Sequence, residues 1–517
     1  MSEPLTVEPA TIADPPWTRL NIRMLLVNVV GDVIRAAPAL LALLLAGGRS
    51  GQGAVWSSVA AGIAVLAGTT RWATTRYRIT GAQVQLRTGL LRRRRMTVPL
   101  DRVRTVDVQA TLMHRFVGLT RVRLGTGRSD NEKERHLTLD GLSPEQAARL
   151  RADVLHRHPA GAESAEAEPP AASPAVPAQE VELARLDPAW IRYGPFTLTG
   201  FLTLLAVAGL AWRVINEAHV NPDRYAAVRG VRNHVHDTSP VVLAVQATLS
   251  LVVLVAILST AGYVLAFWGF RLTRTAEGTV HVSRGLLTTR ATTIESRRLR
   301  GVELSEPLLL RLVRGARVIA VATGLRVGRG AERGGEILLP PAPKAVAVDV
   351  AAAVCRTDQP GVASLRPHPE AAQRRRFTRA GLAVVGVAAV AVALAVQDAP
   401  AAVPLLLGLT AVALVPVAFD RYRSLGHALV AGFFVVREGT IVRRRVALET
   451  EAIIGWNLRS SWFQRRAGVT TLVATTACGR QKYRALDLSA AEAVPFAETA
   501  TPGLLTPFLE TSDTAAG

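Results

Sequence analysis

The stretch YRITGAQVQLRTGLLRRRRMTVPLDRVRTVDVQATLMHRFVGLTRVRLGT, residues 77–126, decides the fold because related stretches recur at 270–323 and 422–476. Each copy carries a turn glycine, a second glycine 29, 30 or 29 residues later, and a threonine eight residues after that. Landmarks that match at matching gaps identify internal repeats. In the order of the three copies, they are Gly89, Gly118 and Thr126, then Gly285, Gly315 and Thr323, then Gly439, Gly468 and Thr476.

Each repeat shows the pattern of a small antiparallel β-domain. Val84 and Leu86 alternate with polar residues, which predicts a half-buried strand before the glycine turn. Further strands and a short apolar helical turn follow, up to and beyond the second glycine. An amphipathic helix closes the repeat, and Ser143 in the first copy and Ser489 with Glu492 in the third indicate capping boxes at its start.

Apolar runs long enough to cross a hydrocarbon layer of roughly 30 Å precede the repeats in pairs. The pairs are about 24–46 with 53–70, 195–214 with 240–268, and 380–396 with 401–419. We therefore expect an α+β membrane protein with six transmembrane helices in three hairpins. Each hairpin is followed by a small β-sandwich or barrel domain that ends in a helix.

Arginine clusters lie between the pairs, while the loops within the pairs are short or mixed in charge. Such a bias predicts cytoplasmic β-domains and termini in a multi-pass protein of the cell membrane. The expected division is a tail and hairpin (1–70), domain 1 (71–158), a linker (159–190), a hairpin (191–269), domain 2 (270–357), a linker (358–379), a hairpin (380–419) and domain 3 (420–510).

The net charge is +21, and only three of the 61 basic residues are lysines. In a chain with membrane spans, such a balance favours an anionic lipid surface as partner. Nucleic acid is not expected, because few aromatic residues interleave with the arginines of the first copy. The two cysteines are far apart and His219, His234 and His236 match no ligand motif, so we expect no metal or cofactor. The absence of a catalytic constellation predicts a protein that is not an enzyme.

Two arginine blocks follow the turn glycines, Arg92, Arg93, Arg94 and Arg95 in the first copy and Arg443, Arg444 and Arg445 in the third. One interpretation is contact with anionic phospholipid head groups, at about 1 kcal/mol per basic residue near the surface. The other is a solvated charge run that only sets topology. The second copy offers only Arg290 at this turn.

Asp32 and Arg35 lie one helical turn apart within the first apolar run, where they can neutralise each other. They indicate either a polar pathway or a contact with another helix, with another membrane protein as a partner, or else a pair near the interface with Arg35 extended toward water. An alternative function is therefore a transporter or a regulatory subunit of a transport complex.

The repeats resemble the bacterial pleckstrin-homology domain of YdbS/YdbT-like membrane proteins. The resemblance rests on the strand, glycine and basic turn, on the arginine-rich step after Pro99, and on the aromatic openings Tyr77, Phe270 and Tyr422. In the second copy, Leu312 stands where the others have Arg115 and Arg465. The resemblance implies a membrane scaffold whose domains bind lipid or a protein partner, with a role in envelope homeostasis or stress defence.

Overall fold

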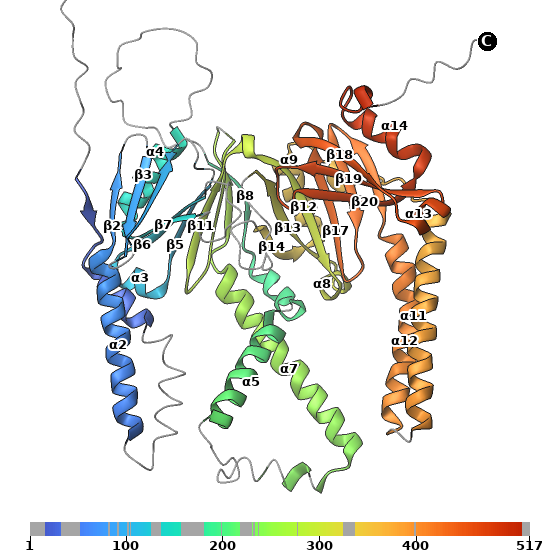
Figure 1. Cartoon of the computed structure of the whole chain (residues 1–517), viewed down its shortest axis with the longest axis horizontal. Coiled ribbons are helices and arrows are strands. Elements are labelled where there is room, and N and C mark those ends of the chain that lie inside the picture. Colours follow the sequence, from blue (N-terminus) through green and yellow to red (C-terminus); the bar gives the residue numbers. More distant parts are fainter. Residues whose placement is uncertain are drawn as a thin grey trace, which may run out of the picture. The chain divides into compact units, whose positions relative to one another are not determined.

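A computed structural model gives the architecture of the chain (Figure 1). The chain divides into two compact units, each described by itself. The first unit contains residues 1–176, 201–254 and 286–292, and the second contains residues 177–200, 255–285 and 293–517. The described residues are 16–32, 52–80, 83–89, 93–100, 103, 105–125, 136–156, 180–197, 199–217, 230, 233–235, 237–276, 278–323, 337–397 and 400–508.

The first repeat forms two sheets around an apolar core. One sheet contains β1 (Thr18–Arg19), β2 (Arg76–Ile79), β3 (Gln83–Thr88) and β4 (Arg94–Pro99) in this order. The other pairs β5 (Thr105–Ala110), β6 (Thr120–Gly125) and β7 (His136–Leu142). The short helix α3 (Leu112–Val117) connects β5 to β6, and α4 (Pro144–His156) closes the repeat. Alternation places apolar side chains such as Val84 and Leu124 in the core, as the sequence predicted.

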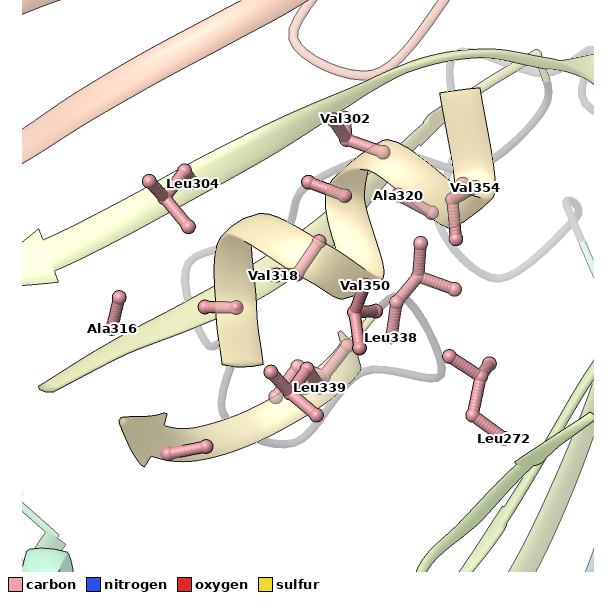
Figure 2. Close-up of a cluster of buried hydrophobic side chains, with 14 of the residues drawn as sticks. Leu272, Val302, Leu304, Ala316, Val318, Ala320, Leu338, Leu339, Val350 and Val354 are labelled. Carbon is pink, nitrogen blue, oxygen red and sulfur yellow. The ribbon is translucent and has the colours of Figure 1, made fainter. Parts of the chain in front are cut away.

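The second repeat has the same element order. It contains β9 (Arg271–Arg274), β10 (Val280–Arg284), β11 (Thr289–Ile294), β12 (Leu299–Pro307), α8 (Leu308–Leu312), β13 (Gly315–Ala322), β14 (Ile337–Pro343) and α9 (Lys344–Cys355), and β8 (Val181–Arg185) pairs with β9. Val350 and Val354 of α9 pack into the same cluster as Val318 and Leu339 of the strands (Figure 2). The closing helix thus seals the sheet, as the amphipathic pattern predicted.

The third repeat contains β15 (Gly426–Val430), β16 (Phe433–Glu438), β17 (Val442–Glu449), β18 (Ile453–Arg459), α13 (Trp462–Arg466), β19 (Val469–Thr476), β20 (Lys482–Ser489) and α14 (Ala490–Ala500). Strands β18, β19 and β20 form one sheet. Phe434 of β16 and Phe496 of α14 lie in the core between the sheet halves.

The second and third repeats share one six-stranded sheet, with the strand order β14-β13-β12-β17-β16-β15. β12 and β17 pair antiparallel from Gly301 opposite Leu448 to Pro307 opposite Val442. A Cβ atom at Gly301 would overlap the carbonyl oxygen of Ala447, so only glycine permits this approach. The shared sheet crosses the predicted boundary between domains 2 and 3, and it leaves no open edge on either strand.

Three helices in the described ranges are long and apolar enough to cross a membrane: α7 (Pro240–Phe267), α11 (Glu370–Val396) and α12 (Ala402–Arg423). The helices α2 (Gln52–Thr74) and α5 (Thr199–Glu217) occupy two further predicted spans, and residues 23–32 start another as a helix. Neither α2 nor α5 is among the helices that meet this length and composition, and the predicted span 24–46 extends beyond the described residues. The full arrangement of six spans therefore stays a prediction.

The backbone corrects one landmark of the repeat. After the short helices of the first and third repeats, Gly118 and Gly468 have positive φ angles of 69° and 63°, but in the second repeat the left-handed residue is Arg314, with φ 56°. Arg314 follows Gly285 by 29 residues, which restores the spacing of the other two copies. Gly315 instead begins β13, where a Cβ would collide with Leu310. The extra residue between the glycines is thus no insertion, and Arg311 corresponds to Arg115 and Arg465.

The capping box at Ser143 is present, since Ser143 and Gln146 exchange side-chain to backbone hydrogen bonds. The one predicted at Ser489 is wrong: Ser489 makes no capping bond, and the amide of Ala490 donates instead to the Gly468 carbonyl. Tyr422 does not open a strand either, because it lies in the last turn of α12 and its hydroxyl donates to the His368 carbonyl.

Candidate anion-binding site

Three arginines lie directly opposite one another on adjacent strands of the first repeat. Arg76 of β2 faces Arg87 of β3, and Arg87 faces Arg95 of β4. Their neighbours Tyr77, Leu86 and Met96 pack against the core, so the arginines occupy the outer face of the sheet. Like charges in directly opposed positions destabilise a sheet. Two such opposed pairs in one row therefore suggest a negatively charged ligand.

The arginine row borders a pocket of about 540 Å³ beside the C-terminal end of α2. Arg87 stacks on Trp17, with its guanidinium carbon 4.0 Å from the ring centroid, and this contact fixes one wall. The pocket is lined by Ala73, Thr74, Arg76, Arg87, Thr88, Gly89, Arg93 and Arg95. Gly89 has φ 102°, so the turn needs glycine and leaves the pocket rim without a side chain.

Four guanidinium groups thus converge on one cavity. Within the part of the chain that the structure describes, no carboxylate forms an ion pair with Arg76, Arg87, Arg93 or Arg95. Planar guanidinium groups bind phosphate and carboxylate oxygens in bidentate geometry. The volume and the donors fit a phosphate group with the organic group that carries it.

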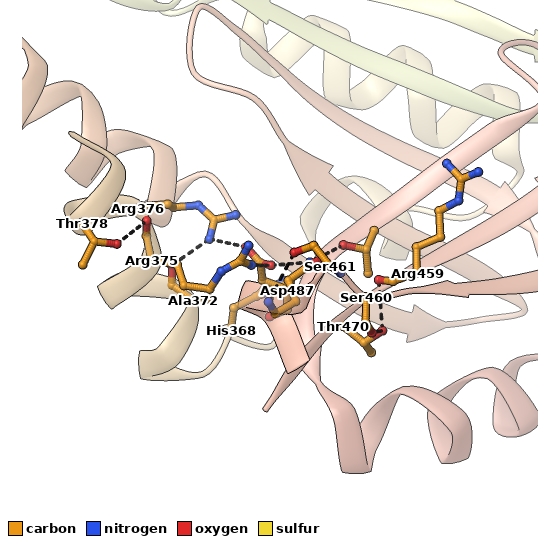
Figure 3. A network of polar contacts seen from close by, with 12 residues as sticks. His368, Ala372, Arg375, Arg376, Thr378, Arg459, Ser460, Ser461, Thr470 and Asp487 are labelled. Atoms are coloured by element: carbon orange, nitrogen blue, oxygen red, sulfur yellow. Dashed lines mark hydrogen bonds and ion pairs between the residues drawn. The ribbon is translucent and has the colours of Figure 1, made fainter. Parts of the chain in front are cut away.

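Two other arginine clusters lie in the second unit, and in both of them the arginines form ion pairs with a carboxylate. The carboxylate of Asp487 in β20 accepts from Arg375, from Arg376 at 2.9 Å and from Gln464 at 2.8 Å (Figure 3). Arg375 and Arg376 belong to α11, two turns or less before its apolar run, and Gln464 belongs to α13. Asp487 therefore joins a membrane-type helix to the third repeat.

A histidine pair lies beside Asp487. His368 Nδ1 is 3.3 Å from the Asp487 carbonyl, and its ring meets that of His427 edge-on with centroids 4.9 Å apart. Burial lowers the pKa of His368 to about 4, and the neighbouring His427 contributes to the same shift. Burial also lowers the pKa of His427, so both rings are neutral near pH 7.

Glu303 of β12 is the centre of the second cluster. Its side chain is 1% exposed, and one carboxylate oxygen lies 3.2 Å from Arg444 Nε and 3.1 Å from an Arg480 nitrogen. Burial raises the pKa of Glu303, while Arg480 and Arg444 act in the opposite direction. This cluster stabilises the sheet shared by the second and third repeats.

A family model described as Bacterial PH domain matches residues 26–158, 230–354 and 379–496, which is well over half of the chain. The chain belongs to the bacterial PH domain family. The prediction of three PH-like repeats is thereby confirmed, and each matched stretch includes at least one of the helices α2, α7, α11 or α12. Comparison with curated proteins and with solved structures finds no match.

The first predicted arginine block belongs in part to the pocket of the first PH repeat. Arg93 and Arg95 line it, while Arg92 lies outside the described residues. Arg94 lies opposite Thr88 on β4. Sequence reasoning missed Arg76, Arg87 and Trp17. The signal was the strand register, because Arg87 and Arg95 each lie four residues from position 91, the midpoint of the hairpin in which Thr88 pairs with Arg94.

The second predicted block, Arg443 to Arg445, lies on β17, where all three side chains contact other parts of the protein. Arg443 forms an ion pair with Asp420 at 2.8 Å, and Arg444 reaches Glu303. Arg445 donates to the carbonyls of Pro360 and Ala363, and burial lowers its pKa to about 10. Head-group binding by this block stays a prediction, and the structure gives Arg444 a contact between the second and third PH repeats.

Of the intramembrane pair predicted in the first span, Asp32 and Arg35, only Asp32 belongs to the described residues. Asp32 lies 3.5 Å from Arg71 in the last turn of α2, and Arg35 lies outside the described residues. Of the three loop histidines, His219 and His236 also lie outside them. Within the described ranges no group of three His, Cys, Asp or Glu side chains gathers around a metal position. Nothing in the described residues tests the alternative of a transporter or a regulatory subunit, which stays a prediction.

Proposed function

We propose that the protein is a non-catalytic membrane scaffold of the cell membrane, and that its first PH repeat binds a phosphate-bearing lipid head group in the basic pocket. The observation that carries this proposal is the opposed row of Arg76, Arg87 and Arg95 without a carboxylate partner in the described chain. The β-domains and both termini are assigned to the cytoplasmic side, where anionic lipids attract arginine.

The position of the pocket supports a lipid as the source of the phosphate. The apolar run of α2 ends near Thr70, and the pocket begins at Ala73 and Thr74. At 1.5 Å per residue, this places the pocket about 5 Å beyond the end of the apolar run. The head-group layer of a bilayer occupies that distance from the hydrocarbon core.

The test uses the full-length chain in detergent and measures bound lipid by native mass spectrometry. Short-chain phosphatidylglycerol, phosphatidylcholine and inorganic phosphate are titrated separately. We expect phosphatidylglycerol to bind most tightly. Its head group has a net negative charge, which the choline of phosphatidylcholine neutralises, and its acyl groups add contacts that inorganic phosphate lacks. Arg87→Glu should weaken this binding by roughly tenfold or more, since charge reversal both removes one attraction and adds a repulsion.

The matched control is Arg149→Glu, which makes the same charge change at an exposed position of α4. Its binding of phosphatidylglycerol should stay at the wild-type value. Equal weakening by the two variants would reduce the effect to net charge and contradict a defined site. Phosphate binding as tight as phosphatidylglycerol binding would retain the site but assign it to a soluble anion.

A further inference from the structure

The three short helices α3, α8 and α13 occupy the same position in the three PH repeats and expose large apolar side chains. When the repeats are aligned on Gly118, Arg314 and Gly468, all three helices begin with two apolar residues and have arginine at the fourth position. The most exposed apolar side chains are Phe116 at 82%, Leu312 at 72%, Phe463 at 67% and Trp462 at 57%. Exposed apolar patches, unlike single exposed side chains, mark protein–protein or membrane interaction sites.

In the first unit, α3 packs against the start of the first predicted span. Met113 and Val117 of α3 pack on the cluster that contains Met24 and Val27, and Trp72 of α2 joins the same cluster. Arg23 also donates to the Val117 carbonyl at 3.4 Å. Since the predicted apolar run begins at Met24, the exposed face of α3 lies beside a membrane boundary.

In the second unit, α8 contacts the C-terminal end of α12. Arg311 of α8 forms an ion pair with Asp420 at 3.1 Å, and the amide of Leu308 donates to the Ile441 carbonyl. Asp420 follows directly on Phe419, where the predicted apolar run ends. The exposed Leu312 is therefore within one short helix of the boundary of that span.

The third helix is attached to α11 through Asp487. Gln464 of α13 and Arg376 of α11 bind the same carboxylate. Arg376 precedes the apolar run by four residues, which corresponds to about 6 Å along the helix. Trp462 and Phe463 stack edge-on with centroids 5.0 Å apart, and Arg466 lies over the Trp462 ring. Tryptophan next to arginine is typical of a membrane interface.

We infer that α3, α8 and α13 insert their exposed apolar side chains into the head-group layer of the bilayer that the membrane helices cross. The occupant of these faces is the lipid surface, because each face is attached beside the boundary of an apolar run. The inference rests on the proposed membrane attachment, but it does not depend on the anion pocket. Each of these contacts would orient its own PH repeat on the membrane.

The test is spin-label accessibility in the full-length chain, reconstituted in nanodiscs of phosphatidylglycerol and phosphatidylcholine. Labels are placed by Phe116→Cys, Leu312→Cys and Phe463→Cys after Cys355→Ala and Cys478→Ala remove the native thiols. Oxygen concentrates in lipid and a polar nickel complex in water, so their collision rates with the label report its depth. We expect all three labels to collide more with oxygen than with nickel.

Two control positions separate the possible outcomes. Ile454→Cys lies at the opposite end of β18 from α13 and is 65% exposed, so its label should report water. Leu382→Cys lies in the apolar run of α11 and should report lipid. If Leu382 reports lipid but the three helix labels report water, or are shielded from both reagents by protein, the inference is wrong and the membrane attachment stands. If Leu382 itself reports water, both fail.

Discussion

Replacing Asp487 by asparagine should loosen the third PH repeat from the end of α11. The side chains of Asp487, Arg375 and Arg376 are 9%, 11% and 7% exposed, so the two arginines would keep their buried charges without a counterion. Removing one partner of a buried ion pair costs about 3–5 kcal/mol. Asp487 has φ 58°, a left-handed conformation that asparagine also tolerates, so the substitution changes the charge without adding backbone strain.

Hydrogen exchange of the full-length chain measures this loss locally. A cost of about 3 kcal/mol or more raises the opening equilibrium at least a hundredfold, so amides of β20 and α14 should exchange faster by that factor. The control is Glu370→Gln, which breaks an ion pair of the same helix with Arg374, at side-chain exposures of 82% and 80%. Exposed pairs contribute about 0.3–0.5 kcal/mol. If Asp487→Asn accelerates exchange no more than this control, the buried network does not attach the repeat.

Three further changes test other parts of the second unit. Gly301→Val should separate β12 from β17 and speed exchange of both strands, because its side chain would meet the Ala447 carbonyl; unchanged exchange would rule out the shared sheet. Since the folded pKa of His368 is about 4, below the unfolded 6.5, the unfolded state binds the proton first. The contribution of neutral His368 to the free energy of unfolding should thus be fully present above pH 6.5 and decrease by up to about 3 kcal/mol toward pH 4. The melting temperature should fall with it, and His368→Gln should remove most of this fall. Asp420→Asn should increase the mobility of a spin label at position 312, because Arg311 loses its partner.

Periodicity was enough to predict the internal architecture of each repeat. Strand alternation around Val84 and Leu86 places these side chains toward the core, and the amphipathic closing helices were found within a few residues of their true ends. Such features depend on neighbours in sequence, which a single chain displays directly. The recurrence of the pattern three times gave independent support for the same fold.

The pairing between repeats could not be predicted in the same way. A period of two tells which face of a strand is buried, but it contains no information on which strand meets its edge. The sequence therefore offered only head-group contact or solvation for the arginines of β17, although Arg444 lies against Glu303 from another repeat, 141 positions earlier in the chain. The sequence also misplaced the left-handed residue of the second repeat. Glycine suggested Gly315, but the backbone has the left-handed conformation one residue earlier, at Arg314.

The distribution of arginines also changes what the net charge of +21 means for the membrane. Arg376 and Arg444 are neutralised at short range by Asp487 and Glu303, and an ion pair presents little field to a surface several ångströms away. Arg87 has a tryptophan face beside it but no carboxylate in the described chain, so its charge acts outward. Attraction to an anionic leaflet should therefore depend on the position of a basic residue rather than on the total. We therefore expect the strongest attraction at the first PH repeat, where four arginines line one pocket.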